Sequence, residues 1–332
     1  MIISRTPFRI SFFGGGTDYP VWYTENGGAV LNTTIDKYCY ISCRYLPPFF
    51  KHKYLIRYRL REEVSSVSQI KHPSVRECLK FMRIDRGIEI VHTSDLPARS
   101  GIGSSSTFTV GFLNALYALK GRMVGKRCLA SNALYIEQDI IGENVGSQDQ
   151  VAAAFGGLNR IEFNGKESFL VQPITVDQSK VKELQDHLMF FFTGFSRTAS
   201  EIAAEQIQNT SSKTAALYAM KDMVEEAVNV LNSRREKIGR FGELLDESWK
   251  LKKSLSSRVT TDVIDRMYDT AVKAGAIGGK LCGAGGGGFM LLFVPPRKQR
   301  MVKEALKELL YVPFHFETLG SQITLYANQE PY

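Results

Sequence analysis

A stretch rich in glycine and serine, residues 97–106 (PARSGIGSSS), has the composition and the setting of a phosphate-binding loop. The alternating apolar residues 87–92 before it predict a strand, and the apolar run 108–119 after it predicts a buried helix. The order is therefore strand, small-residue loop and helix N-terminus. Backbone N–H groups at such a terminus are free to bind an anion, which the helix dipole also attracts.

The side chains of this loop suit the same chemistry. Gly101 and Gly103 have no Cβ to keep a ligand away from the backbone, and Ser104, Ser105 and Ser106 offer hydroxyl groups for hydrogen bonds or for Mg²⁺. No Gly-Lys-Ser/Thr sequence closes the loop, so it is not a Walker loop, and its glycine spacing is not that of dinucleotide-binding folds. An ordinary helix cap remains the alternative interpretation, because such turns often precede helices.

A second stretch of bare backbone, Gly14-Gly15-Gly16, follows residues 2–13, which predict a strand. Three consecutive glycines cost conformational entropy, so we expect a close approach by another group or a positive φ angle. Thr17 and Asp18 then add a hydroxyl and a carboxylate, and carboxylate oxygens accept the hydrogen bonds that sugar hydroxyls donate. A plain turn in which Asp18 caps a short helix at residues 20–24 explains these residues equally well.

Three charged side chains occupy positions where chemistry is possible. Glu137 lies beside the apolar stripe of a predicted helix at residues 126–141. Asp149 lies among small residues at a predicted helix start, where it could take a proton from a substrate hydroxyl. Arg197 follows a predicted strand at residues 187–193 and could clamp a phosphate or carboxylate. The plainer interpretations are a half-exposed glutamate, a helix-capping aspartate and a surface arginine; for Asp149 considered alone, capping is favoured.

A third glycine-dense block lies between two apolar runs in residues 277–294, which predict a strand, a turn and a buried strand. The turn, Gly283-Ala284-Gly285-Gly286-Gly287-Gly288, costs far more conformational entropy than the Asn-Gly turn that a simple hairpin needs. We therefore expect that another backbone packs against it or that it closes over a ligand site.

The elements between these blocks predict an α+β chain with two domains. The polar segment 176–185 marks the boundary, which gives an N-terminal domain of residues 1–180 and a C-terminal domain of residues 181–332. The order of elements in the second domain is close to a ferredoxin-like unit. The other predicted strands are residues 28–32, 38–45, 54–60, 158–163, 169–171, 313–318 and 322–326. The other predicted helices are residues 75–82, 213–232, 241–255, 262–274 and 299–311.

Composition excludes several classes of protein. The chain has 332 residues, 44% hydrophobic and 23% charged, as in globular proteins. Its net charge is +8, but the basic residues are scattered, and the stretch 51–61 alternates with apolar residues like a strand with one wet face, not like a nucleic-acid patch. Five cysteines without a Cys-x-x-Cys pair argue against disulfides or zinc and indicate a reducing cytoplasm. Arg5 and Arg9 exclude a signal peptide, and no apolar run is long enough for a membrane span.

Three motifs in order resemble the GHMP family of small-molecule kinases, which includes galactokinase, homoserine kinase and mevalonate kinase. The motifs are residues 7–11 with the Gly14–Asp18 block, Pro97–Ser106 and Gly283–Gly288, and the resemblance covers essentially the whole chain. It implies the α+β two-domain GHMP kinase fold, with a ribosomal-protein-like N-terminal domain, a ferredoxin-like C-terminal domain and the active site between them. It also implies an enzyme that uses ATP and Mg²⁺.

Within this family the chain is most similar to kinases of D-glycero-D-manno-heptose 7-phosphate. Residues 8–19, 146–157 and 279–288 carry this similarity. It implies phosphorylation of the anomeric hydroxyl to a 1,7-bisphosphate, which feeds a nucleotide-activated heptose for surface polysaccharide. Galactokinases have Gly-Glu-His-Thr-Asp-Tyr where this chain has Gly14 to Tyr19, and the missing Glu-His argues against galactose.

The resemblance assigns roles to individual residues. Asp149 matches the catalytic aspartate, Arg9 matches a basic residue that lowers the pKa of the acceptor hydroxyl, and Ser105 and Glu137 match Mg²⁺ ligands. The residues that match the ATP-binding loop are Pro97, Arg99, Ser100, Gly101, Ile102, Gly103, Ser104, Ser105 and Ser106. The residues expected at the substrate are Gly15, Gly16, Thr17, Asp18, Gly285 and Gly286, with Arg197 and Lys280 for the phosphate that the sugar already carries.

Two departures from the family pattern leave alternatives open. Val151 stands where an aromatic residue is expected, and Arg99-Ser100 stand where small residues are commoner. Fucose, arabinose and galactose therefore remain alternative substrates. A non-catalytic ligand sensor on the same fold predicts loss of Asp149 or Ser105, and both are present. A nucleic-acid-binding module rests mainly on the basic charge. The partner we expect is a small sugar phosphate, bound by a monomer or a homodimer.

Overall fold

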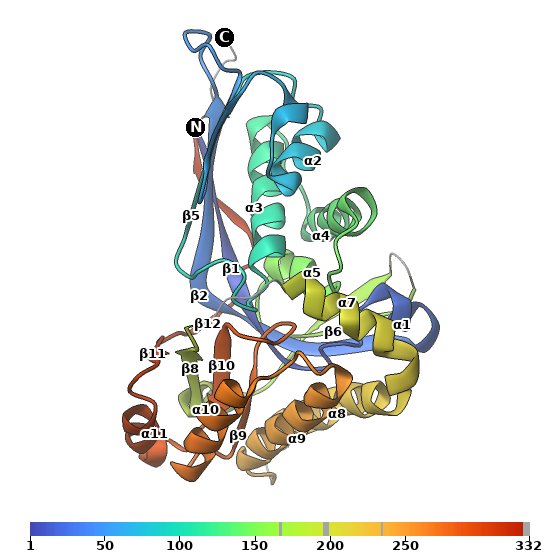
Figure 1. The fold of residues 1–332 in the computed structure, drawn as a ribbon, viewed down its shortest axis with the longest axis vertical. Coiled ribbons are helices and arrows are strands. Elements are labelled where there is room, and N and C mark those ends of the chain that lie inside the picture. The colour runs from blue at the N-terminus through green and yellow to red at the C-terminus, as the bar shows by residue number, and fades with distance from the viewer. Residues whose placement is uncertain (166–167, 195–198, 234, 328–332) are drawn as a thin grey trace.

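The computed structural model describes residues 1–165, 168–194, 199–233 and 235–327. The molecule is elongated, with one mixed sheet and its helices at one end and a smaller sheet with its helices at the other (Figure 1). Among the described residues, no helix is long and apolar enough to cross a membrane.

The first sheet has nine strands built around two long ones, β1 (Ile2–Phe13) and β2 (Gly28–Tyr45), which pair antiparallel. Its main path runs β13-β1-β2-β5-β3-β4. Strands β6 and β12 also pair with β2, and β7 pairs with β6. The remaining strands of this sheet are β3 (Tyr54–Arg57), β4 (Arg61–Val64), β5 (Ile88–Ser94), β6 (Asn159–Phe163), β7 (Phe169–Pro173), β12 (Phe316–Glu317) and β13 (Gln322–Tyr326).

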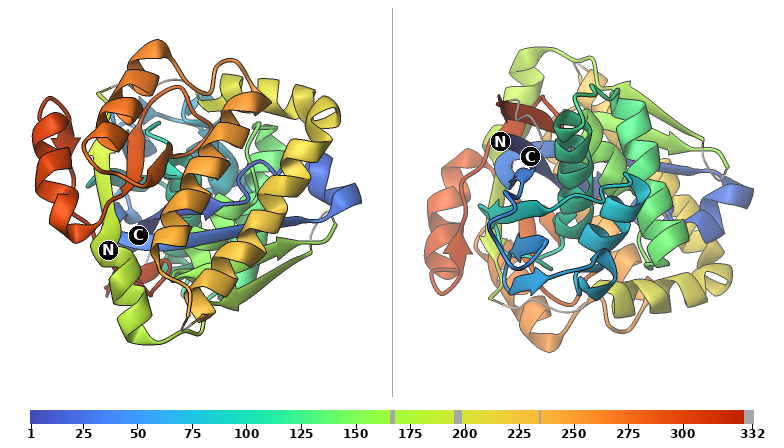
Figure 2. Two further views of the ribbon diagram at one scale, coloured as in Figure 1. Left: turned by 90° about the horizontal axis from the view of Figure 1, so that it is seen from below. Right: turned by 90° about the horizontal axis from the view of Figure 1, so that it is seen from above.

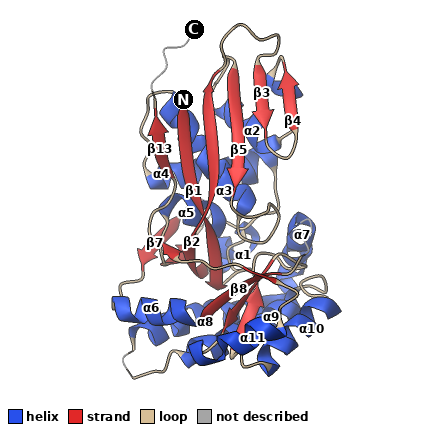
Figure 3. Cartoon of the chain, turned by 90° about the vertical axis from the view of Figure 1, so that its left-hand side faces the viewer, coloured by secondary structure: helices blue, strands red, loops and turns tan. Residues whose placement is uncertain are grey.

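Helices cover one face of this sheet, so that a view from the other side shows the strands in front (Figure 3). The central helix, α3 (Ser104–Leu119), is apolar on most of its surface and is buried, as such a helix must be. Gly111 lets it approach β1 closely, because a Cβ there would lie 2.6 Å from the Thr6 hydroxyl. The other helices of this unit are α1 (Pro20–Asn26), α2 (Pro73–Phe81), α4 (Lys126–Leu134) and α5 (Gln148–Phe155).

The second unit has a four-stranded antiparallel sheet in the order β11-β8-β10-β9. Its strands are β8 (Leu188–Phe192), β9 (Gly278–Leu281), β10 (Phe289–Phe293) and β11 (Leu310–Tyr311). Counted along the chain, this order is fourth, first, third and second, which is the ferredoxin-like arrangement and confirms that prediction. The helices are α6 (Gln178–His187), α7 (Ala199–Asn209), α8 (Thr214–Asn232), α9 (Gly239–Leu255), α10 (Asp262–Lys273) and α11 (Gln299–Ala305).

Helices α8 and α9 join the two units. Figure 2 shows them from below, lying side by side across this end of the molecule. Val224 of α8 and Phe241 of α9 belong to the same buried cluster as Phe12 and Phe13 of β1, and Phe241 makes edge-to-face contacts with both of these rings. The main hydrophobic core therefore continues from the first sheet into the second unit.

Several sequence predictions differ from the structure. The strand predicted at 54–60 ends at Arg57, and a separate strand follows at Arg61–Val64. Residues 28–45 form one strand, because both sides of the polar residues Asp36 and Lys37 still pair with β1. The helix predicted at 126–141 changes at Tyr135 into a π-helix that ends at Ile141. The helix predicted at 299–311 ends at Ala305, because Leu310 and Tyr311 pair with β8. The two last strands form, but they pair with β1 and β2 and so belong to the first sheet.

The return of the chain to the first sheet depends on close contact at Gly156, which ends α5 with φ 69°. A Cβ on Gly156 would lie 2.1 Å from the backbone of Leu319 and Gly320. We expect Gly156→Ala to lower the free energy of unfolding by about 2–4 kcal/mol, through backbone strain and overpacking together. Gly142 has a similar φ of 76° with nothing near its Cβ position, so Gly142→Ala should cost only about 1 kcal/mol. Equal losses in urea denaturation would contradict the close packing.

Candidate active site

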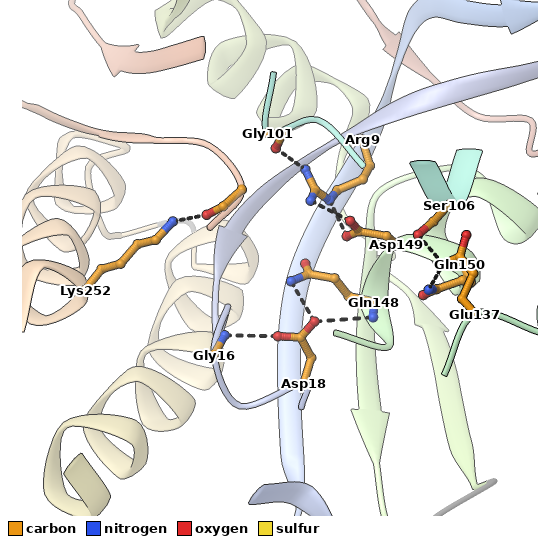
Figure 4. Close-up of polar contacts among 11 residues, drawn as sticks. Arg9, Gly16, Asp18, Gly101, Ser106, Glu137, Gln148, Asp149, Gln150 and Lys252 are labelled. Atoms are coloured by element: carbon orange, nitrogen blue, oxygen red, sulfur yellow. Dashed lines mark hydrogen bonds and ion pairs between the residues drawn. The ribbon is translucent and has the colours of Figure 1, made fainter. Parts of the chain in front are cut away.

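An ion pair between Arg9 of β1 and Asp149 in the first turn of α5 lies at the centre of the site (Figure 4). Arg9 donates from Nε to Oδ1 at 2.6 Å and from Nη2 to Oδ2 at 2.9 Å, so the contact is bidentate. Its Nη1 donates to the carbonyl of Gly101 at 2.7 Å. The structure thus joins the first sequence motif, the glycine-serine loop and the predicted catalytic aspartate through one guanidinium group.

The two partners differ in exposure. The Arg9 side chain is 5% exposed, whereas that of Asp149 is 21% exposed and remains open to a ligand. Burial of the guanidinium works against its charge, but the Asp149 carboxylate outweighs this effect and raises the pKa of Arg9. Arg9 is therefore a permanent positive charge that holds the carboxylate in one orientation.

The glycine-serine loop leads into α3 as the sequence predicts. Gly103 stands immediately before the helix in the left-handed region, with φ 74°, and no side chain caps the first turn. The N–H groups of that turn therefore remain available to an anion. A Cβ on Gly103 would lie 3.1 Å from Oδ2 of Asp149, so the bare backbone here brings the carboxylate beside the loop.

The other loop residues hold its shape. Arg99 has φ 60°, and its N–H donates to the Ser104 hydroxyl at 3.1 Å, while the hydroxyl of Ser100 donates to the carbonyl of Pro97 at 2.6 Å. The carbonyl of Ile102 accepts from the Arg9 N–H at 3.3 Å.

The glycine block of the second unit packs directly on this loop. A Cβ on Gly283 would lie 2.4 Å from Cα of Gly101, and a Cβ on Gly101 would lie 2.4 Å from the carbonyl oxygen of Cys282. The Phe289 N–H donates to the carbonyl of Ser100 at 3.2 Å. The sequence suggested that another backbone packs against this turn or that the turn closes over a ligand. The structure shows the first, and the backbone that packs there is the glycine-serine loop of the candidate site.

Asp18 lies next to this centre and is almost completely buried. Its carboxylate accepts from the Gly16 N–H at 3.0 Å and from Nε2 of Gln148 at 3.0 Å. Burial raises the pKa of Asp18, and the nearby charge of Asp149 raises it further, against these hydrogen bonds. The hydroxyl of Thr17 instead donates to the carbonyls of Gly14 and Ala29, which makes Thr17 part of the turn that supports Asp18.

In the structure, the hydroxyl that contacts Glu137 is that of Ser106, the residue after the predicted ligand Ser105. Glu137 is fully buried, and its Oε2 accepts from the Ser106 hydroxyl at 2.7 Å and from Nε2 of Gln150 at 2.5 Å, whereas Ser105 is exposed. Successive residues of a helix point about 100° apart, so only one of the two serines can face Glu137. Burial raises the pKa of Glu137 to about 7, and within the described chain its Oε1 has no hydrogen-bond partner.

The remaining predicted substrate residues are scattered around this centre. Gly15 lies near Ser11 and Gln148, and Gly285 and Gly286 pack against Val259. Lys280 is buried, and its Nζ donates to the carbonyl of Phe12 at 2.7 Å. Arg197 lies outside the described residues.

Sequence reasoning missed two residues near this centre, Gln148 and Lys252. Gln148 contacts Asp18, and its position next to Asp149 was the only signal. Lys252 is buried on α9, and its position on the helix could have revealed it. It continues the stripe of Leu244, Ser248 and Leu255, which are all buried, so the helical repeat places it on the inner face.

Two further features of the described residues indicate no other catalytic site. A hollow of about 530 Å³ is lined by residues between Tyr45 and Lys53 and between Asp85 and Gly87, and contains none of the site residues. No cluster of three or more His, Cys, Asp or Glu that could hold a metal ion is present in the described ranges.

Comparison with known proteins shows the family of this chain. The family model for the GHMP kinase N-terminal domain matches residues 72–157, and the model for the C-terminal domain matches residues 223–312. The chain is 31% identical to the D-glycero-alpha-D-manno-heptose 7-phosphate kinase of Campylobacter jejuni, over 94% of this chain and 95% of that protein. It is 27% identical to the galactokinase of Pyrococcus furiosus, over 92% of each.

The solved structure of a D-glycero-D-manno-heptose 1-phosphate kinase from Bacteroides thetaiotaomicron superimposes with a TM-score of 0.80 and 26% identity. It covers 98% of this chain and 100% of that one. The two-domain GHMP kinase fold is thus established. The chain belongs to the GHMP kinase family and is an ATP-dependent phosphotransferase.

The contact between Gly103 and Asp149 predicts a large effect of a single methyl group. We expect Gly103→Ala to lower kcat/KM about 100-fold, because the Cβ would displace the carboxylate and strain the loop. Gly121→Ala is the matched control, since Gly121 has φ 67° and open space around its Cβ position. Steady-state kinetics with thermal melts of both variants test this. A Gly103→Ala enzyme as active as the control would show that Asp149 does not work beside this loop.

Proposed function

We propose that this enzyme transfers the γ-phosphoryl group of ATP to the anomeric hydroxyl of D-glycero-D-manno-heptose 7-phosphate. The observation that carries the proposal is the bidentate Arg9–Asp149 pair beside the bare loop at Gly101 and Gly103. The near full-length similarity to the Campylobacter jejuni kinase supports the substrate class. The product is the 1,7-bisphosphate, which serves the synthesis of an activated heptose.

In this mechanism the residues position and neutralise groups and form no covalent bond to them. The α3 N-terminus and the loop hold the triphosphate, and the Asp18 carboxylate accepts hydrogen bonds from sugar hydroxyls. Asp149 takes the proton of the acceptor hydroxyl while that oxygen bonds to the γ-phosphorus and the bond between the γ-phosphorus and the ADP oxygen breaks. Arg9 keeps the carboxylate aimed at the hydroxyl and offsets the negative charge of the transferred group.

Mg²⁺ fits the donor set that the loop provides. Oxygen ligands suit this ion, and Glu137 has a buried oxygen without a partner beside the hydroxyl of Ser106. We propose that Glu137 and a hydroxyl of the first turn of α3, from Ser106 or from the exposed Ser105, hold the ion. When bound, it neutralises charge on the triphosphate.

The names of two related proteins differ in the position of the phosphate on the sugar substrate. The Campylobacter jejuni relative is named for heptose 7-phosphate and the Bacteroides structure for heptose 1-phosphate, so the phosphate that the sugar carries differs between the two names. A non-catalytic sensor on this fold is disfavoured, because Arg9 and Asp149 are both present and in contact. Fucose, arabinose and galactose are the competing substrates.

A substrate panel tests the proposal directly. With ATP and Mg²⁺, the purified enzyme should consume heptose 7-phosphate with a higher kcat/KM than heptose 1-phosphate, the free heptose, fucose, arabinose or galactose. Product analysis by ³¹P NMR should show a new phosphate on the anomeric oxygen. A clear preference for one of the other sugars would contradict the substrate, and no turnover of any sugar would contradict the reaction.

Asp149→Asn serves as the catalytic control in the same assay. It should lower kcat about 10²–10⁴-fold, the range for losing a general base. It should also lower the melting temperature, because the buried Arg9 loses the negative charge that pairs with it. The matched variant is Asp269→Asn, which changes an exposed aspartate of α10 and should retain wild-type kinetics.

The raised pKa of Glu137 predicts a pH-dependent stability. Between about pH 4.5 and pH 7 the folded protein keeps a proton that the unfolded chain has released, so the free energy of unfolding falls as the pH rises and levels off above pH 7. Glu137→Gln should lack this component of the profile. Urea denaturation at several pH values measures the difference between the two proteins.

The same pair of proteins tests the metal site without an activity assay. At pH 8, Mg²⁺ added with ADP should raise the melting temperature of the wild type more than that of Glu137→Gln, because only the wild type has a carboxylate to bind it. An equal rise in both proteins would place the ion elsewhere.

A further inference from the structure

Two buried lysines of the second unit converge beside the candidate active site. Lys252 of α9 is 5% exposed and Lys280 of β9 is 2% exposed. The Nζ of Lys252 donates to the carbonyls of Gly283 and Leu281, and Lys280 donates to the carbonyl of Phe12. In Figure 4, Lys252 extends from its helix toward the carbonyl of the glycine turn to which it donates.

The charges of these lysines are not matched within the described part of the chain. Neither forms an ion pair with a carboxylate, although lysines this deeply buried are usually paired. An ammonium group has three N–H donors, so Lys280 retains two after its bond to Phe12 and Lys252 retains one. A doubly charged phosphate supplies both the missing negative charge and the missing acceptors.

The location of the lysines fits the far end of a sugar phosphate. Leu255 lies one helical turn after Lys252, and its Cδ1 is 3.4 Å from the Cβ position of Gly16, beside Asp18. The charge of Asp18 acts on the pKa of both lysines, and the charge of Asp149 acts on the pKa of Asp18. Arg9, the partner of Asp149, acts on both lysines as well, so the lysines lie within electrostatic range of Asp18 and of the Arg9–Asp149 pair.

We propose that Lys252 and Lys280 together bind the phosphate group that the acceptor sugar already carries, and so select phosphorylated over unphosphorylated sugars. This inference rests on the proposed function and adds Lys252, which sequence reasoning missed. The ATP phosphates have their own partners in the loop, the α3 N-terminus and Arg9, so the two lysines are left for a second anion.

The electrostatics of the pair agree with such a role. Burial lowers the pKa of Lys252 to about 7, aided by repulsion from Lys280, and burial lowers that of Lys280 to about 8. The other charged or titratable groups that act on them are Arg9, Asp18 and Cys282. A bound phosphate favours the charged lysines, so KM for the sugar phosphate should rise from pH 7 to pH 9 as they lose protons.

The decisive measurement is the ratio of kcat/KM for heptose 7-phosphate to that for the free heptose. Lys252→Met should lower this ratio about 10- to 100-fold, the loss expected for a hydrogen bond to a charged group, and Lys280→Met should do the same. Lys252→Arg should restore much of the ratio, because it keeps the charge. Lys253→Met, which changes the neighbouring half-buried lysine paired with Asp265, should leave the ratio unchanged.

Other outcomes would overturn the inference. An equal loss for both sugars in Lys252→Met would assign the lysine to the transferred phosphoryl group or to the support of the glycine turn. An unchanged ratio in every variant would leave the lysines without a role in specificity. If the methionine variants do not fold, two measurements still test the inference: the ratio for Lys252→Arg, and the pH dependence of the wild-type KM for each sugar. A purely structural lysine would change KM equally for both sugars.

This result is separable from the proposed function. A wild-type enzyme that phosphorylates neither heptose rejects the proposed reaction. An enzyme that prefers heptose 7-phosphate while its lysine variants keep that preference rejects only the role of Lys252 and Lys280.

Discussion

The bidentate contact between Arg9 and Asp149 is the constraint on which the site depends. Arg9 comes from the central strand of the first sheet, Asp149 from the start of α5, and the same guanidinium holds the carbonyl of Gly101 in the phosphate loop. A planar, permanently charged group with donors in a fixed fork can fix three segments at once, which a lysine could not do. The aspartate therefore has one orientation before any substrate binds, and the loop is held beside it.

Close backbone contacts between glycines align the two halves of the molecule around this pair. Gly101 and Gly283 approach so closely that a methyl group on either would meet backbone atoms, and Gly103 leaves room for the carboxylate of Asp149. Gly101 and Gly283 belong to different units, so their contact fixes how the glycine turn of the second unit sits on the glycine-serine loop of the first. The entropy lost by ordering so many glycines is offset by a site that needs little rearrangement.

The sequence predicted much of this arrangement, for identifiable reasons. Gly101 and Gly103 were singled out because a strand, a bare loop and a helix start have local signatures, and Asp18 because it follows three glycines. Asp149 was assigned its role through the resemblance to the GHMP kinases, since its local pattern alone favoured a helix cap. The long helix expected at residues 299–311 failed because its apolar period continues into Leu310 and Tyr311, which pairing with β8 converts into a strand. The sequence could not show that Ser106 contacts Glu137, because Ser105 and Ser106 are adjacent and only the rotation of α3 decides which one faces the carboxylate.

The sequence by itself determined the residue types of the candidate site, the glycine-serine loop before α3 and the alternation of helices and strands, because each depends on neighbours close in the chain. Only the tertiary structure decided which groups meet. It joined Arg9 to Asp149 across 140 residues, returned the last strands to the first sheet, and turned Lys252 inward beside Lys280. Such pairings depend on the packing of segments distant in the sequence, where burial and unmatched charge, not local pattern, set the outcome.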